Sequence, residues 1–180
     1  MRRNEGPLAF SAIDFLSCLL LVVLALIAPP PEPQSPSVEQ EGVYLLIATW
    51  PKALDYDVDV YVQDPAGRIV FFANPDLAGI HLARDDLGAF NDTAGNEERV
   101  TFRAVEQGEY VVTIHAYKTR GPVSVKVVLH KLRGHDGKVL ERTVRLRGEG
   151  DELTFTRFTV DKDGLVVGLS DLPKTLADVA

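Results

Sequence analysis

Asp14 has the clearest potential for chemistry, because it is the only charged side chain within residues 8–28. These 21 residues would form a helix roughly 31 Å long at about 1.5 Å per residue, which matches the hydrocarbon core of a bilayer. A carboxylate near the centre of such a helix costs about 2.5 to 3.5 kcal/mol on insertion scales. We therefore expect Asp14 to face protein or trapped water and to serve a function there.

The predicted helix has one narrow polar side. Its members fall at helical spacings that place them together: Ser11, Asp14, Ser17 and Cys18. Small residues let helices approach closely inside a membrane, so we expect this side to pack against other helices. Other interpretations stay open, namely a plain anchor that tolerates the acid, a cleaved signal peptide and a lipoprotein signal. The length of the run and the proline that follows it disfavour cleavage.

Residues 10–23 resemble the transmembrane segment of the B subunits of ion-driven 5:2 motors, the family of MotB, ExbD and TolR. The resemblance implies that Asp14 carries a translocated proton or sodium ion. It also implies a homodimer inside a pentamer of multi-span A-type subunits. The resemblance ends there, because the chain has no OmpA-like pattern, no amphipathic plug after the helix and no evident counterpart of the ExbD or TolR periplasmic domain.

Charge and proline content divide the chain into segments. Two arginines precede the apolar run and three glutamates follow it (Arg2, Arg3, Glu32, Glu39 and Glu41), so the positive-inside rule places the N-terminus in the cytoplasm. The proline-rich stretch predicts an extended linker of up to roughly 40 Å. We expect a bacterial inner-membrane protein with a periplasmic domain, divided into a tail (1–7), a transmembrane helix (8–28), a linker (29–42), a folded domain (43–170) and a C-terminal tail (171–180).

From residue 43 onward, short runs of alternating apolar and polar residues are separated by turn signals, which is typical of β-strands. The clearest alternation, in residues 110–116 and 123–129, predicts two strands that face a common core. A slip of the apolar phase near Thr156 and Arg157 predicts a bulge. We expect an all-β domain, a β-sandwich of jelly-roll or Ig-like type, with strands at 44–50, 58–63, 68–73, 99–104, 110–117, 123–132, 138–147, 153–160 and 165–168.

A cluster of carboxylates surrounds the second predicted strand and a later loop: Asp55, Asp57, Asp59, Asp85 and Asp86. Together with Trp50, the run from residue 55 to 67 resembles secreted bacterial modules of the pre-peptidase C-terminal type, some of which hold calcium. Carboxylate oxygens are ligands that Ca²⁺ prefers, so these residues are candidate calcium ligands. No EF-hand-like spacing fixes them, and the alternative of a solvated strand face stays open.

Other signals are weaker. A net charge of −7 without a long basic block argues against nucleic acid as a partner. The sequence has no nucleophile elbow, P-loop or dinucleotide-binding glycine pattern, so we do not expect an enzyme. The four histidines do not lie at metal-ligand spacing. His115 is expected opposite Lys126, and His130 opposite Val111, in a hairpin.

Aromatic and basic side chains offer two further candidates. Trp50, Phe71 and Phe72 form either a sugar-binding platform or part of the core, and basic residues in 131–147 form either a partner surface or a solvated face.

Taken together, the sequence predicts the B subunit of an ion-driven motor that acts on an unidentified cell-envelope target. The alternative is a membrane-anchored module that binds glycan or protein without ion transport.

Overall fold

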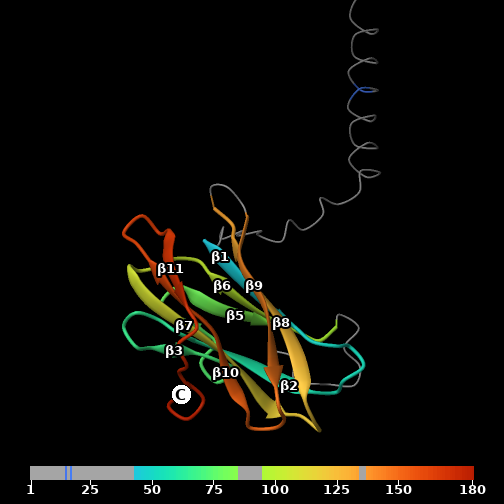
Figure 1. Ribbon diagram of the computed structural model, residues 1–180. Coiled ribbons are helices and arrows are strands. Elements are labelled where there is room, and N and C mark those ends of the chain that lie inside the picture. The colour runs from blue at the N-terminus through green and yellow to red at the C-terminus, as the bar shows by residue number, and fades with distance from the viewer. Residues whose placement is uncertain (1–14, 16, 18–42, 85–94, 134–136) are drawn as a thin grey trace, which may run out of the picture. The chain divides into compact units, whose positions relative to one another are not determined.

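The computed structural model describes residues 15, 17, 43–84, 95–133 and 137–180 (Figure 1). Phe15 and Ser17 are helical and exposed, whereas Ser11, Asp14 and Cys18 lie outside the described residues, as does the linker. Among the residues described, no helix is long and apolar enough to cross a membrane. The chain divides into two compact units, Met1–Glu39 and Gln40–Ala180, and every strand belongs to the second.

The second unit contains two antiparallel sheets that pack face to face around one core (Figure 1). One sheet has the strand order β4-β5-β6-β1-β8-β9 and the other β11-β10-β7-β2-β3. This arrangement confirms the predicted all-β fold. The strands are β1 (Tyr44–Thr49), β2 (Asp57–Gln63), β3 (Ile69–Val70), β4 (Asp76–Leu77), β5 (Ile80–Arg84), β6 (Glu97–Phe102), β7 (Gly108–Lys118), β8 (Val123–Lys131), β9 (Gly137–Leu146), β10 (Glu152–Val160) and β11 (Val166–Ser170).

The core lies where the alternating faces of both sheets meet. Apolar residues at every second position of β7 and β8 are fully buried in it, as the sequence predicts: Tyr110, Val112, Ile114, Ala116, Val123, Val125, Val127 and Leu129. Near its centre, Phe158 stacks on Tyr110 with ring centroids 5.0 Å apart. It also meets Phe102 edge-on at 5.8 Å. Packed rings of this kind add specific geometry to the burial of apolar area.

The predicted hairpin between β7 and β8 is wrong, because these strands belong to different sheets. His115 lies opposite Asp59 and Glu152, whereas His130 lies opposite Leu45 and Lys138. Alternation shows that both strands bury one face in a core. It does not show whether they do so from the same sheet or from opposite sheets.

Local predictions agree with the structure only in part. The segment 68–73 forms only the short β3 and a tight turn, and β4 and β5 were not predicted. They are joined by a turn in which Ala78 and Gly79 both have positive φ, 52° and 79°. Alanine rarely adopts positive φ, so its presence in the sequence does not predict such a turn. The predicted bulge exists, but its register shift lies between Thr154 and Thr156. The predicted C-terminal tail, residues 171–180, contains a turn at 177–179.

Glu98 and Arg142 bridge the sheets on the two lateral sides of the sandwich. On one side Glu98 of β6, which is only 1% exposed, accepts a 2.6 Å hydrogen bond from the backbone N–H of Val60 in β2. On the other side Arg142 of β9 donates a 3.2 Å hydrogen bond to the carbonyl of Phe155, at the bulge of β10. Strand β3 pairs only with Val62 and Gln63, so Glu98 supplies an acceptor where β2 has no neighbouring strand.

Candidate functional site

Five rings form a continuous array on the outer face of the five-stranded sheet. We call this array the aromatic surface; it consists of Tyr61, Phe71, Phe72, His115 and Tyr117. Tyr61 stacks on Phe71 with ring centroids 5.4 Å apart, and Phe71 meets Phe72 edge-on at 5.3 Å. Phe72 lies 6.0 Å from Tyr117, and His115 lies 5.9 Å from Tyr61 and 6.4 Å from Tyr117. Each ring therefore contacts at least two others.

The strands place three of these rings by simple alternation. Val60, Ile114 and Ala116 point into the core, so the intervening residues of β2 and β7 must point outward. Tyr61, His115 and Tyr117 occupy those outward positions. Because β2 and β7 pair with Asp59 opposite His115, the three rings lie close together on the same face.

A tight turn after β3 supplies the other two rings. The backbone N–H of Phe71 donates to the carbonyl of Asn74 at 3.3 Å, and the N–H of Asn74 donates back to the carbonyl of Phe71 at 3.0 Å. The Asn74 amide also donates to the carbonyl of Ile69 at 3.2 Å. These bonds hold Phe71 and Phe72 against the sheet.

The aromatic surface presents two of its rings to solvent. Phe72 is 44% exposed and Tyr117 is 54% exposed, whereas Tyr61 is buried beneath them. Aromatic side chains usually bury most of their area in a core or an interface. Two adjacent exposed rings, supported by three others, therefore form a candidate binding surface.

An acid–base pair lies beside these rings. The buried Asp59, 4% exposed, has its carboxylate Oδ2 3.6 Å from Nδ1 of His115. Contact with this carboxylate raises the pKa of His115 above its ordinary value; burial opposes the effect, and the charges of Glu152 and Asp178 reinforce it. Burial raises the pKa of the Tyr61 hydroxyl as well, with further contributions from Asp59 and Glu152. Nearby carboxylates therefore raise the pKa of both His115 and Tyr61.

Glu152 fixes the C-terminal tail across the same sheet. Its carboxylate accepts hydrogen bonds from the backbone N–H of Leu176 at 2.7 Å and of Ala177 at 3.2 Å, and from the hydroxyl of Thr113. Leu176 is completely buried in a small cluster with Tyr61 and Val111, against which Phe71 also packs. The tail thus supports the aromatic surface by packing against Tyr61 and Phe71.

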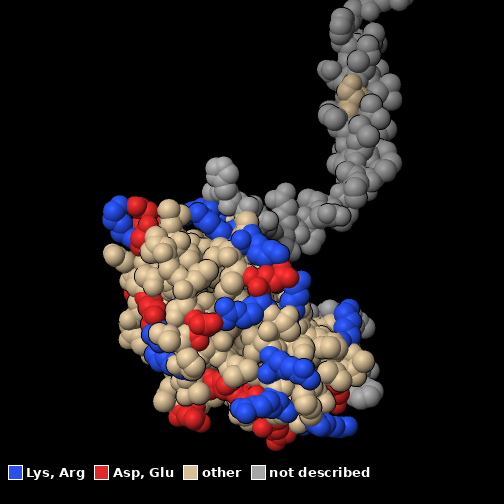
Figure 2. Space-filling view, in the orientation of Figure 1, with Lys and Arg blue, Asp and Glu red and all other residues tan. Residues whose placement is uncertain are grey.

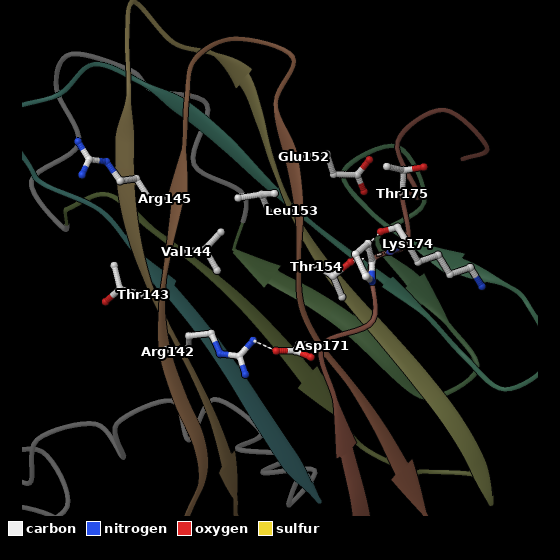
Figure 3. Close-up of a pocket in the computed structure, with 11 residues that line it drawn as sticks. Arg142, Thr143, Val144, Arg145, Glu152, Leu153, Thr154, Asp171, Lys174 and Thr175 are labelled. Carbon is white, nitrogen blue, oxygen red and sulfur yellow. Dashed lines mark hydrogen bonds and ion pairs between the residues drawn. The ribbon is translucent and has the colours of Figure 1, made fainter.

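A cavity of about 320 Å³ lies between β9, β10 and the tail (Figure 3). Figure 3 shows Arg142 directed toward Asp171, at 3.7 Å, while Arg145 extends away from the cavity. Thr154 and Lys174 exchange hydrogen bonds between the threonine hydroxyl and the tail backbone. Two pairs of lining residues, Arg142 with Asp171 and Thr154 with Lys174, thus fasten the tail to β9 and β10, which favours a structural role for this part of the molecule. A second cavity, of about 570 Å³, lies between β11 and residues Tyr44, Lys131 and Val139.

The predicted calcium ligands are only partly described. Asp57 and Asp59 are buried on β2, so they are not a solvated strand face, and Asp59 is engaged with His115. Asp55 is exposed, and Asp85 and Asp86 lie outside the described residues. In the part of the chain that the structure describes, no group of three or more acidic, histidine or cysteine side chains is arranged to hold a metal ion. The calcium site stays a prediction.

Of the three aromatic residues singled out from the sequence, Trp50 belongs to the core, where its indole N–H donates to the carbonyl of Tyr56 at 3.1 Å. Phe71 and Phe72 lie on the aromatic surface. Tyr61, His115 and Tyr117 were not predicted to join them. The available signal was the occurrence of aromatic residues at the outward positions of two alternating strands.

Several basic residues of the β8–β9 hairpin and the turn after it are paired with acids. Lys126 lies 3.1 Å from Glu141, which Lys138 also contacts. Arg147 lies 3.0 Å from Asp151. Figure 2 shows cationic and anionic side chains interspersed on the face in view. This mixture favours a solvated face over a surface for an anionic partner.

Comparisons of the chain with known protein families, with curated proteins and with solved structures find no match.

Proposed function

We propose that this chain is a membrane-tethered binding protein whose sandwich engages a target in the cell envelope through the aromatic surface. The observation that carries the proposal is the exposure of Phe72 and Tyr117 next to each other on a supported sheet face. Exposed apolar side chains gathered in one place mark interaction sites more often than scattered ones do. The apolar run at residues 8–28 would provide the tether.

The test is binding of the full-length protein, held in lipid nanodiscs, to isolated cell-envelope material in a sedimentation assay. Replacing Phe72 and Tyr117 together with serine is expected to weaken the affinity at least tenfold, because each lost aromatic contact costs on the order of 1 kcal/mol. Leu165→Ser provides a control, since Leu165 is similarly exposed but belongs to another part of the surface. Equal binding by the wild type and the double variant would rule out the aromatic surface as the binding site.

Asp14 favours a second and more specific function, in which the same binding protein is the B subunit of an ion-driven motor. In this proposal two copies lie inside a ring of five multi-span A-type subunits, and Asp14 binds and releases a proton or sodium ion at the ring. Neutralising the buried charge would permit each step. The sandwich would transmit the movement to the envelope target.

For the motor, Asp14→Asn is expected to abolish ion-dependent activity in cells while leaving the protein's abundance and its copurifying partners unchanged, because the amide cannot bind and release a proton. Ser17→Ala, on the same predicted side of the helix, is the matched control and should retain activity. The measurement is ion flux through membranes that contain the copurified complex. Normal flux in Asp14→Asn, or recovery of the chain without a multi-span partner, would rule out the motor. The tethered binding protein would then be the remaining proposal.

A further inference from the structure

The exposed area of the aromatic surface indicates how much of a ligand the two rings can contact. A Phe or Tyr side chain presents roughly 200 Å², so the exposed fractions of Phe72 and Tyr117, 44% and 54%, amount to roughly 100 Å² each. A stable protein–protein interface buries about 800 Å² on each partner. The two rings fall far short of that area, but together they match the face of one or two sugar rings.

The shape of the site points in the same direction. The ring planes of Phe72 and Tyr117 are inclined by 49°, and neither cavity described above includes a residue of the aromatic surface. Cofactors and small apolar ligands are usually enclosed in a concave pocket. An open pair of rings instead suits a flat ligand that stacks on the surface and continues beyond it, as the units of a polysaccharide do.

Charge narrows the ligand class further. The carboxylate of Asp59 contacts the imidazole of His115, and the charges of Glu152 and Asp178 also act on this imidazole. Three carboxylates around one edge of the aromatic surface disfavour anionic ligands such as phosphates and uronic acids there. At the edge of the rings, His115 and the hydroxyl of Tyr117 offer groups that can hydrogen-bond to sugar hydroxyls.

We infer that the aromatic surface binds an uncharged saccharide, whose apolar ring face stacks on Phe72 and Tyr117. This inference rests on the proposed binding function and names its ligand class. Tyr61 and Phe71 act as positioning residues, because their stacking and the burial of Leu176 beside them hold Phe72 in place. Phe72 and Tyr117 are the residues that contact the ligand.

The test is a titration of the full-length protein in detergent with three soluble probes, followed by changes in its NMR spectrum or by calorimetry. The probes are tri-N-acetylchitotriose and cellohexaose, which are uncharged, and an oligogalacturonate, which is anionic. At least one uncharged probe is expected to bind with a Kd at or below the millimolar range, and the oligogalacturonate is expected to bind at least tenfold more weakly. Phe72→Ala and Tyr117→Ala should each weaken binding about tenfold.

Leu169→Ala is the matched control, because Leu169 is comparably exposed on β11, and it should bind like the wild type. Tetramethylammonium chloride is a fourth probe, since exposed rings also attract organic cations. Binding of this cation without binding of either uncharged saccharide would overturn the inference, and so would preferred binding of the anionic probe. If the serine variant loses envelope binding but no saccharide binds, the ligand class is wrong and the binding function stands. If the serine variant keeps envelope binding and no saccharide binds, both proposals fail.

Discussion

Replacing Glu98 with alanine is expected to lower the free energy of unfolding by about 3 kcal/mol, because the backbone N–H of Val60 would lose its buried acceptor and a space would remain between the sheets. In a domain of this size the midpoint of thermal unfolding should fall by roughly 10 °C. Trp50 is the only tryptophan of the chain and is buried in the core. Its fluorescence therefore reports sandwich unfolding directly in the full-length protein.

Two variants separate the hydrogen bond from the charge. Glu98→Gln keeps an oxygen that can accept from Val60, so it should lose less stability than Glu98→Ala. Glu97→Gln removes a neighbouring carboxylate that contacts Arg99 near the surface, and it should cost less than about 1 kcal/mol. If Glu98→Ala is no more destabilising than Glu97→Gln, the bridge between β6 and β2 does not stabilise the sandwich.

Glu152→Ala is expected to release the C-terminal tail. The change removes the acceptor for two backbone N–H groups and for the hydroxyl of Thr113, which is fully buried. Hydrogen bonds to a charged group contribute about 1.5 to 3 kcal/mol each, so losing these three bonds should lower the free energy of unfolding by about 4.5 kcal/mol or more. Amide hydrogen exchange at Leu176 and Ala177 should become at least tenfold faster.

Glu149→Ala is the control for Glu152→Ala, because it removes the same charge from an exposed position in the turn before β10. It should leave tail exchange unchanged. If the tail is released, Tyr61 and Phe71 lose the packing of Leu176, so saccharide binding should weaken as well. Slow exchange at Leu176 in Glu152→Ala would show that apolar packing alone holds the tail.

The sequence predicts the fold class well because alternation is a local property. Every second residue of β7 and β8 is apolar, and those residues are buried as expected. The sheet assignment of the two strands could not be predicted, since it depends on partners far away in the chain. β7 pairs with β2 and β10, whereas β8 pairs with β1 and β9.

The aromatic surface could be predicted only in part, because it too depends on pairing between strands that are far apart in the chain. Phe71 and Phe72 are adjacent and easily noticed, but Tyr61 and Tyr117 join them only through the register of β2 with β7. Likewise, no local pattern links Glu98 to Val60, which is 38 positions away, or Glu152 to the tail. Acids that pair across sheets resemble ordinary surface acids in a sequence.

The position of β1 determines how the sandwich would respond to mechanical load. β1 directly follows the linker and lies in the middle of its sheet, paired over its whole length with both β6 and β8. At the point of entry, Val43 donates to the carbonyl of Phe102 at 2.6 Å and accepts from the N–H of Leu132 at 2.9 Å. A pull applied through the linker is therefore shared by two neighbouring strands from the first residue. Extracting β1 would require both ladders to rupture together, so in the proposed function the domain would be suited to transmitting force between a membrane tether and its ligand.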